Sequence, residues 1–430
     1  MKILKFGGTS VGSVQRIRNV AQLVAQRGEN LVVLSAMAGT TNTLVEIAGY
    51  LYNHNPEGAR DTILTLQNQY LAHAGELFPG KASAMEFVND VFDSIKALTR
   101  EPFTLADEKF LLSRGEILSS RMLAWVLEDM GVNVRLLSAL EFMRLGEDGE
   151  PDLEYIKTHL KPLLKGADLY LTQGYICLNA RGETDNLQRG GSDYTACLAG
   201  AAVQAEEIQI WTDIDGMHNN DPRYVEGTSA VRHLSFDEAA ELAYFGAKIL
   251  HPSCIQPARH AGVPVRLLNT LEPEAPGTII DSRPDTGTIK AVAAKDKITA
   301  IKIKSSRMLL AHGFLRKVFE IFESYRTPID MICTSEVGVS MSIDDTSYLG
   351  EIVHDLKKYG TVEVDLDMCI ICVVGDMNWE NLGFETAVLE AMKDIPVRMV
   401  SYGGSNYNIS LLVKEQDKVR ALRALSAKLF

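Results

Sequence analysis

Short stretches that combine glycines with charged and hydroxyl side chains recur along the first 250 residues, and this combination is typical of sites that bind phosphate. A glycine-rich turn presents backbone N–H groups to an anion, while lysine and arginine neutralise its charge. Any one stretch could be an ordinary turn, a helix cap or a surface ion pair. Together they indicate phosphoryl transfer, where catalysis depends on positioning and charge neutralisation. The stretches are KFGGTS at residues 5–10, SRGE at 113–116, RGGSD at 189–193, WTD at 211–213, DPR at 221–223 and GAK at 246–248.

The first of these stretches has the local pattern of an anion-binding turn. Residues 1–4 form a short apolar run of strand type, and residues 14–27 carry apolar side chains at helical spacing. Strand, Gly-Gly turn and helix aim backbone N–H groups at one point, and Lys5 adds a full positive charge. Taken alone, the stretch could equally be a tight turn without a ligand.

The elements that must position these residues alternate between strands and helices over some 270 residues. This alternation predicts an α/β/α sandwich with a mainly parallel sheet, whose ligands bind at the carboxyl ends of the strands. We expect residues 173–193 to be a loop. The expected strands include 31–36, 132–137, 168–172, 207–211 and 263–268, and the expected helices include 43–52, 104–130, 194–204 and 235–246.

The pattern changes at residues 272–290, where prolines and glycines crowd a polar stretch that is typical of a linker. Beyond it, shorter elements recur twice in a βαββ order, which predicts two small α+β units. Neither unit holds a cluster of catalytic residue types, so a sensor or assembly role is expected. We therefore divide the chain into a catalytic domain (1–285), a linker (286–297) and a regulatory region (298–430) with units at about 298–365 and 366–430.

Composition narrows the classes of protein. The formal net charge of −13 and the scattered basic residues argue against nucleic-acid binding, which needs a clustered basic face. No apolar run reaches the roughly 18–20 residues that cross a bilayer, and no secretory signal is evident at the N-terminus. Six cysteines in apolar contexts favour a reducing cytoplasm.

Cys369 and Cys372 have the C-x-x-C spacing of redox and zinc motifs. They lie in an apolar strand-like run, where an offset of three residues places the two side chains on opposite faces. No second Cys or His pair lies nearby in the sequence. We therefore interpret them as core residues and predict no protein metal site.

The complete motif set resembles that of aspartate kinase. The motifs occur in that family's order over nearly all of residues 1–270, and the later repeat resembles the family's tandem ACT regulatory domains. The resemblance implies an amino-acid-kinase fold followed by ACT units. With no dehydrogenase-like region downstream, it implies a monofunctional kinase resembling the lysine-sensitive type. The motifs are KFGGTS at 5–10, SAMAGTTN at 35–42, SRGE at 113–116, RGGSDYTA at 189–196, WTD at 211–213, DPR at 221–223 and GAKILHP at 246–252.

The resemblance implies the reaction L-aspartate + ATP → 4-phospho-L-aspartate + ADP, the first step toward lysine, threonine and methionine. ATP and Mg²⁺ are the implied cofactors. A carboxylate nucleophile with a pKa near 4 is already ionised at pH 7, so no general base is needed. Repulsion between this anion and ATP is the obstacle, which cations and backbone dipoles would overcome.

Individual roles also follow from the resemblance. Lys5 would neutralise charge on the transferring phosphoryl group, and Asp193 would orient Lys5 or a Mg²⁺-bound water. Glu116 would pair with the ammonium of aspartate. The implied catalytic set is Lys5, Asp193 and Arg189; the aspartate-binding set is Thr41, Glu116, Arg189, Gly190, Gly191 and Ser192; the ATP-binding set is Lys5, Gly7, Gly8, Ser10, Thr212, Asp213, His218, Arg223 and Lys248.

Two positions depart from the family pattern in the catalytic region. Gln188 stands where glycine usually precedes the Arg-Gly-Gly run, and His218 stands where tyrosine is common. In the regulatory region, Ala311 and Pro328 replace polar residues typical of the lysine pocket. These departures concern the loop conformation, the nucleotide contact and the effector hydrogen bonds, respectively.

The regulatory half resembles the effector pocket of lysine-inhibited aspartate kinases. Asp330 or Glu336 would meet the lysine amines, and backbone near residues 313–315 would meet its carboxylate. Threonine, or no effector, remains an alternative. ACT units usually pair edge to edge, so a homodimer is expected. The candidate effector residues are Met308, Gly313, Phe314, Leu315, Ile329, Asp330, Ser335 and Glu336.

Two other functions remain open. One is another kinase of the same fold, such as a glutamate 5-kinase or a carbamate kinase; the SRGE and RGGSDYTA motifs and the ACT repeat favour aspartate. The other is a catalytically inactive amino-acid sensor. The presence of Lys5, Glu116, Arg189, Asp193 and Lys248 argues against lost activity.

Overall fold

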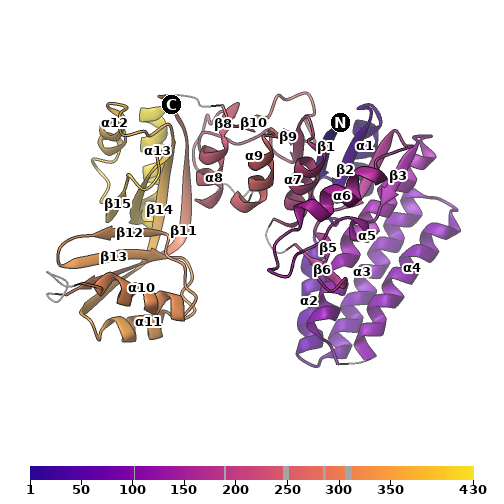
Figure 1. Ribbon diagram of the computed structural model, residues 1–430, viewed down its shortest axis with the longest axis horizontal. Coiled ribbons are helices and arrows are strands. Elements are labelled where there is room, and N and C mark those ends of the chain that lie inside the picture. Colours follow the sequence, from indigo (N-terminus) through magenta and orange to yellow (C-terminus); the bar gives the residue numbers. More distant parts are fainter. Residues whose placement is uncertain (101, 188–189, 246–250, 284–286, 306–311) are drawn as a thin grey trace. The chain divides into compact units, whose positions relative to one another are not determined.

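The computed structural model describes residues 1–100, 102–187, 190–245, 251–283, 287–305 and 312–430 (Figure 1). The chain forms two compact units. Unit 1 comprises Met1–Met217 and Ile249–Ser282, and unit 2 comprises His218–Lys248 and Arg283–Phe430.

The sheet of unit 1 is mainly parallel, as expected. Its strands follow the order β3-β4-β2-β1-β7-β9-β10, and all neighbours pair in parallel except β9 and β10. The inner strands β2 and β4 are buried over their whole length, which is typical of a sheet covered on both faces. The strands are β1 (Lys2–Phe6), β2 (Asn30–Leu34), β3 (Val134–Leu137), β4 (Leu169–Gln173), β7 (Ile208–Thr212), β9 (Val265–Asn269) and β10 (Thr278–Asp281).

Helices cover both faces of this sheet, which confirms the three-layer sandwich. Leu4 shares a core with α1 (Val14–Ala25) and α5 (Leu105–Asp129). Ile3 instead faces α7 (Gly191–Val203), where a Cβ added at Gly200 would lie 3.5 Å from its side chain. Successive strand residues point to opposite faces, so α7 and α5 lie on opposite sides. The remaining helices are α2 (Thr40–Tyr52), α3 (Pro56–Leu77), α4 (Ala82–Ala97), α6 (Leu153–Leu163) and α9 (Gln256–Ala261).

The region expected to be a loop at 173–193 contains a β-hairpin. Strands β5 (Ile176–Leu178) and β6 (Thr184–Asn186) pair in antiparallel register. An ion pair of 2.9 Å between Lys109 Nζ and Asp185 Oδ1 ties the hairpin to α5. Strands of three residues are too short to show an alternating pattern, so sequence periodicity could not predict them.

Unit 2 contains a six-stranded antiparallel sheet in the order β12-β13-β11-β14-β16-β15. Two separate apolar cores lie along it, one around Phe322 and Met341 and one around Ile371 and Leu411. The strands are β11 (Ile289–Lys304), β12 (Met331–Thr334), β13 (Gly338–Ile343), β14 (Thr361–Gly375), β15 (Met399–Ser401) and β16 (Asn408–Lys414), and the helices are α10 (Phe314–Ser324), α11 (Leu349–Leu356), α12 (Phe384–Ala391) and α13 (Lys418–Leu429).

The expected linker 286–297 is wrong over residues 289–297, which form the first half of β11. Val292 in this half pairs with Val373, while Ile301 in the second half pairs with Val364. β11 and β14 therefore run through both halves of the sheet (Figure 1). The two βαββ repeats are thus completed by strands that they share. The half of the sheet that contains β16 starts with the first residues of β11, upstream of the half that contains β13.

Residues 218–245 belong to unit 2, although we expected them in the catalytic domain. The segment contains β8 (His233–Ser235) and α8 (Phe236–Tyr244). Val225 lies in the second core of unit 2, and Asn220 Nδ2 donates to the carbonyl of Leu422 at 3.0 Å. These contacts build a piece of the first 285 residues into the regulatory sheet.

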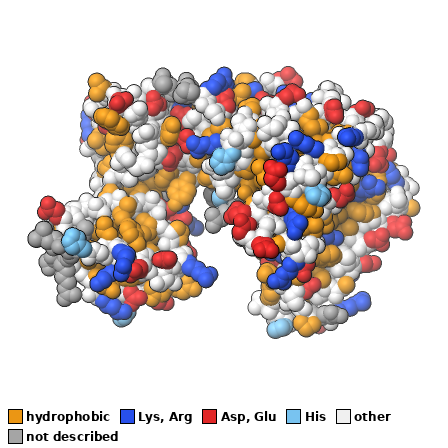
Figure 2. All heavy atoms as spheres, in the orientation of Figure 1, with side chains coloured by type: hydrophobic (Ala, Val, Ile, Leu, Met, Phe, Trp, Pro, Cys, Tyr) orange, Lys and Arg blue, Asp and Glu red, His pale blue; other side chains and the backbone are white. Residues whose placement is uncertain are grey.

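Both cysteines of the C-x-x-C pair are buried in β14 and unbridged, as the core interpretation predicted. Within the described ranges, no helix has the length and apolar character of a membrane span. Acidic and basic side chains are interspersed over the face shown in Figure 2.

Candidate active site

The predicted contact between Lys5 and Asp193 is confirmed. Lys5 Nζ lies 2.7 Å from Asp193 Oδ1, and the two side chains are 11% and 14% exposed. β1 carries Lys5 and is paired on both sides, with β2 and with β7, so the lysine stands on a rigid element. Asp193 lies in the first turn of α7, where the helix dipole favours a negative charge. The arrangement holds one ammonium at the carboxyl end of the sheet.

The turn after β1 needs glycine because two loops approach closely. A Cβ at Gly8 would lie 2.8 Å from the carbonyl oxygen of Ala36, and the Gly8 carbonyl accepts a hydrogen bond from Ala38 N at 3.1 Å. The N–H of Gly7 donates to the carbonyl of Trp211 at 3.3 Å. The Gly7 N–H, which we expected to donate to a phosphate, therefore donates to β7 instead.

Glu116 is a buried carboxylate with spare bonding capacity. Its side chain is 3% exposed, and Oε1 accepts a hydrogen bond from Ala36 N at 3.2 Å. Oε2 is buried and has no partner among the described residues. Burial raises the pKa of Glu116 to about 8. A cationic ligand group would satisfy Oε2 and favour the ionised form.

The neighbouring arginine of the SRGE motif is engaged within its own helix. The Arg114 guanidinium stacks 3.9 Å from the ring centroid of Phe110 and donates to Ser113 Oγ at 2.8 Å. Burial lowers the pKa of Arg114 to about 10. We assign Arg114 to helix packing.

Thr41 lies in the first turn of α2, and its neighbour Thr40 is fixed by a residue that the sequence analysis missed. Thr40 Oγ1 and the Tyr70 hydroxyl are 2.7 Å apart, and both residues are buried. Tyr70 comes from α3, where its apolar spacing resembled that of any core residue. It positions the start of α2 and hence Thr41.

The Arg-Gly-Gly loop is described from Gly190 onward; Gln188 and Arg189 lie outside the described residues. Gly190 has a φ of 66° and precedes α7, and a Cβ there would lie 2.0 Å from Cys254 Sγ. Both the backbone angle and the crowding require glycine. Gly191 also has a positive φ, and Ser192 is buried at the start of the helix.

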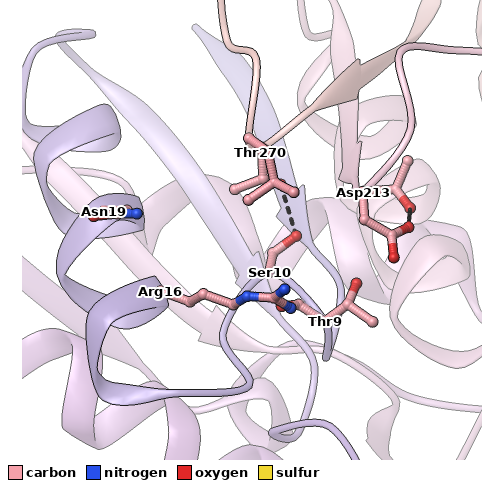
Figure 3. Close-up of a pocket in the computed structure, with 8 residues that line it drawn as sticks. Thr9, Ser10, Arg16, Asn19, Asp213 and Thr270 are labelled. Atoms are coloured by element: carbon pink, nitrogen blue, oxygen red, sulfur yellow. Dashed lines mark hydrogen bonds between the residues drawn. The ribbon is translucent and has the colours of Figure 1, made fainter.

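A hollow opens at the carboxyl ends of β1, β7 and β9 (Figure 3). Ser10 does not reach into it freely, because its hydroxyl lies 2.7 Å from that of Thr270. The Thr212 hydroxyl donates to Asp213 Oδ1 at 3.1 Å. The lining residues are Thr9, Ser10, Arg16, Asn19, Thr212, Asp213, Thr270 and Leu271.

Two other expected nucleotide residues, His218 and Arg223, belong to unit 2, and a third, Lys248, lies outside the described residues. His218 Nδ1 lies 3.0 Å from Thr228 Oγ1. Arg223 forms a two-bond ion pair with Asp221, at 3.0 and 2.6 Å, and its side chain is 76% exposed.

The described effector candidates all lie in unit 2. Gly313 caps α10, which begins with Phe314 and Leu315, while Ser335 and Glu336 lie between β12 and β13. Ile329 and Asp330 precede β12, and Asp330 is 2% exposed. Asp330 Oδ1 accepts from Lys295 at 2.7 Å and from Tyr244 at 2.8 Å, two partners that the sequence analysis missed. Met308 and Ala311 lie outside the described residues.

The chain matches two protein families. The amino acid kinase family matches residues 1–269, and the ACT domain matches residues 371–429. Both matches confirm the expected fold classes. The first covers the residues that hold Lys5, Glu116 and Asp193.

Known relatives match the chain along its whole length. It is 32% identical to lysine-sensitive aspartokinase 3 of Escherichia coli (strain K12), covering 100% of this chain and 99% of the relative. It is 34% identical to the chloroplastic aspartokinase 3 of Arabidopsis thaliana, covering 100% of this chain and 81% of that protein.

Solved structures show the same correspondence. E. coli aspartokinase III in complex with aspartate and ADP (R-state) superposes with a TM-score of 0.87 at 30% identity, covering all of both chains. The same enzyme in complex with lysine and aspartate (T-state) gives 0.83 at 30% identity, covering 100% of this chain and 99% of that one.

Proposed function

The chain belongs to the aspartokinase branch of the amino acid kinase family, and from that premise we propose that it transfers the γ-phosphoryl group of ATP to the side-chain carboxylate of L-aspartate. Two observations carry the proposal: a cation held by an ion pair, and a buried acid with an unsatisfied oxygen. Lys5 lies one residue before the end of β1 and is fixed by Asp193, and Glu116 binds the loop that follows the adjacent β2. One can hold a phosphate charge and the other an amino-acid ammonium.

The reaction needs charge control more than proton transfer. An oxygen of the ionised aspartate side chain attacks the γ-phosphorus, and the bond to the bridging oxygen of ADP breaks. Lys5 stabilises the negative charge on the transferring group, and Asp193 fixes the position of the Lys5 ammonium. No described residue has to remove a proton, because the nucleophile is ionised at neutral pH.

Aspartate is held by groups that match its three charges. Glu116 Oε2 accepts from the ammonium, which favours the ionised carboxylate despite its burial. Arg189 and the loop 190–192 bind the carboxylates, and Thr41 adds a hydrogen bond from the start of α2. The family resemblance supports these assignments.

The nucleotide is held by Gly8, Thr212, Asp213, His218, Arg223 and Lys248. Gly7 and Ser10 are left out of this set, because the Gly7 N–H and the Ser10 hydroxyl both donate to the carbonyl of Trp211 on β7. Thr212 is kept, because its hydroxyl bonds, among the described residues, only to its neighbour Asp213, which belongs to the same set. Mg²⁺ fits the available donors: Asp193 and Asp213 supply the hard oxygens it prefers, and it takes most remaining ligands from phosphates and water. Among the described residues no group of three or more His, Cys, Asp or Glu forms a metal cage. When bound, Mg²⁺ neutralises phosphate charge.

Unit 2 regulates this reaction by binding lysine. Asp330 and Glu336 supply the acids for its amines, and the backbone at 313–315 receives its carboxylate. The enzyme then acts at the head of lysine, threonine and methionine synthesis, as a homodimer paired through ACT units. Six unbridged cysteines support a reducing compartment such as the cytoplasm.

A hydroxylamine assay tests the catalytic proposal, because hydroxylamine displaces phosphate from an acyl phosphate to give a hydroxamate, whose iron(III) complex is coloured. The purified chain with ATP and Mg²⁺ should give hydroxamate and ADP with L-aspartate, and little of either with L-glutamate or carbamate. Turnover of glutamate or carbamate would reassign the enzyme to another kinase of this fold. Absence of ADP release with all three would make the chain a sensor.

A further inference from the structure

The hairpin formed by β5 and β6 contacts one residue of α5 at both its side chain and its backbone. The Lys109 ammonium lies 2.9 Å from Asp185 Oδ1, and the Lys109 carbonyl accepts a hydrogen bond from Asn186 Nδ2 at 3.3 Å. Asp185 Oδ1 also accepts from the backbone N–H of Asn186 at 2.7 Å, which closes a ring of contacts. We call these three residues the hairpin anchor. None of them belongs to a sequence motif.

The hairpin anchor lies on the side of α5 that carries Glu116. Lys109 and Glu116 are seven positions apart in this helix, which is two turns and about 10 Å along its axis. Residues at this spacing share one helix face. The strand β6 packs against α5. The hairpin is therefore fixed to the helix that presents the acid we assign to the aspartate ammonium, and a shift of the hairpin along α5 changes its distance from that acid.

Tyr175 connects the hairpin to the loop that we assign to the substrate carboxylates. Its carbonyl accepts a hydrogen bond from Leu187 N at 2.8 Å, and its N–H donates to Thr195 Oγ1 at 2.9 Å. A Cβ added at Gly191 would lie 3.0 Å from Tyr175 Cδ2, so the ring and the loop approach closely. Tyr175 also has a φ of 68°, a left-handed conformation that is unfavourable for residues other than glycine. The position of the hairpin therefore affects the position of the loop.

Folding stability alone does not account for the hairpin anchor. Lys109 and Asp185 are 17% and 23% exposed, and ion pairs that contact solvent contribute little to stability. Asn186 is buried, and its Oδ1 has no partner among the described residues, which is unfavourable. A leucine of similar size would avoid that unpartnered oxygen. A fixed distance between α5 and the hairpin does account for all three polar side chains.

We propose that the hairpin anchor sets the separation between Glu116 and the loop at residues 190–192, and that this separation selects aspartate over glutamate. The inference rests on the proposed kinase activity and names a determinant of its specificity. The ammonium at Glu116 and the carboxylates at the loop fix the two ends of the substrate, so a rigid separation admits one chain length. Lys109, Asp185 and Asn186 are thus positioning residues and do not contact the substrate.

Asn186→Leu tests the inference without an expected loss of stability. It removes the bond to Lys109 together with the unpartnered buried oxygen, so thermal unfolding should be unchanged or slightly improved. We expect KM for aspartate to rise at least ~5-fold while KM for ATP stays constant. The ratio of kcat/KM for aspartate to that for glutamate should fall at least ~5-fold, within the 10–200-fold range that about one methylene provides. Inhibition by L-glutamate against aspartate gives the same comparison if glutamate is bound without turnover.

Asp185→Asn removes the charge of the hairpin anchor and should lower the same ratio by at least ~3-fold, a conservative part of that range. Asp129→Asn is the matched control. Asp129 ends α5, lies 3.0 Å from Lys81 Nζ and is 56% exposed, so the same substitution breaks an ion pair at the other end of the helix. The control should keep the wild-type ratio.

A wild-type ratio in Asn186→Leu or in Asp185→Asn overturns the inference while the kinase activity stands. An equal decrease in Asp129→Asn also overturns it, because general loosening of α5 would then explain the effect. A wild-type chain that phosphorylates glutamate in preference to aspartate, or neither, removes the proposed function and this inference together.

Discussion

Lys5 Nζ and Asp193 Oδ1 lie 2.7 Å apart and join the end of β1 to the first turn of α7. The two residues come from the first and the fourth of the seven motifs, yet they form one contact at the carboxyl edge of the sheet. A cation held in this way needs no rearrangement to meet a phosphate. Such preorganised charge is usually the largest contribution to catalysis.

Replacing Lys5 should therefore reduce turnover without unfolding the protein. In Lys5→Ala, we expect kcat to fall by at least ~10², the usual effect of losing one preorganised donor. Steady-state kinetics and thermal unfolding measure the two effects. Lys2→Ala is the control on the same strand, since Lys2 is 43% exposed and pairs with Glu207 at 3.5 Å. Equal turnover in both variants would refute the role of Lys5.

Glu116 should make stability fall as pH rises. Its pKa is about 8 in the folded state and 4.5 ordinarily, so between these values the folded state binds more protons than the unfolded state. The free energy of unfolding then decreases from pH 5 to pH 8. Glu116→Gln lacks this titration, and its stability should decrease less over the same range. Urea unfolding at pH 5, 6, 7 and 8 measures the difference.

Glu128→Gln controls for the loss of a charge on the same helix, because Glu128 is 43% exposed. Its pH dependence should match the wild type. If Glu116→Gln also matches the wild type, Glu116 is not the buried titrating acid. L-aspartate should restore stability at pH 8 in the wild type, since its ammonium pairs with the ionised carboxylate.

We expect the Ser10 hydroxyl to contribute to folding stability and not to ATP binding. Its hydroxyl joins the turn after β1 to the end of β9 through Thr270. Ser10→Ala should lower the free energy of unfolding by about 1 kcal/mol, the value of one hydrogen bond, and change kcat/KM for ATP less than threefold. Thr212→Ala is the contrast, for which we expect KM for ATP to rise. A large rise in KM for ATP in Ser10→Ala would return it to the nucleotide set.

Because Gly190 is crowded by Cys254, replacing it with alanine should lower the free energy of unfolding by more than the backbone strain alone would. Gly182 also has a positive φ, but nothing lies within 4 Å of an added Cβ. Gly182→Ala should therefore cost about 1 kcal/mol, whereas Gly190→Ala also displaces Cys254 and should cost more and reduce kcat/KM. Adding Cys254→Ala should recover part of the loss in Gly190→Ala. No recovery in the double variant would show that strain alone explains it.

Local patterns in the sequence predicted the catalytic sheet well. β1, its glycine turn and α1 are specified within the first 27 residues, by an apolar run, two glycines and helical spacing. The contact between Lys5 and Asp193 was expected from the family resemblance, and it lies at the edge of the sheet where parallel strands place ligands. The strand, turn and helix depend on short-range pattern, whereas the contact needed the complete set of motifs.

Long-range pairings could not be predicted in the same way. The first half of β11 is interpreted as linker from its neighbouring prolines, although it pairs with β14 some 80 positions later. Tyr70 and Tyr244 resemble ordinary core or surface residues until their hydroxyls meet Thr40 and Asp330. The use of the Gly7 N–H also depends on β7, which is distant in sequence.

Because both halves of the six-stranded sheet use β11 and β14, neither half can be inherited or exchanged without the other. A gene fragment that began near residue 365 would cut β14. It would also lack Ala293, the residue of β11 that pairs with Cys372 in the C-terminal half of the sheet. Recombination could exchange the continuous stretch 283–430, which holds the whole six-stranded sheet, between relatives, but not one half of that sheet. Loss of structure in either half also removes a strand from the other, so both should melt in one cooperative transition.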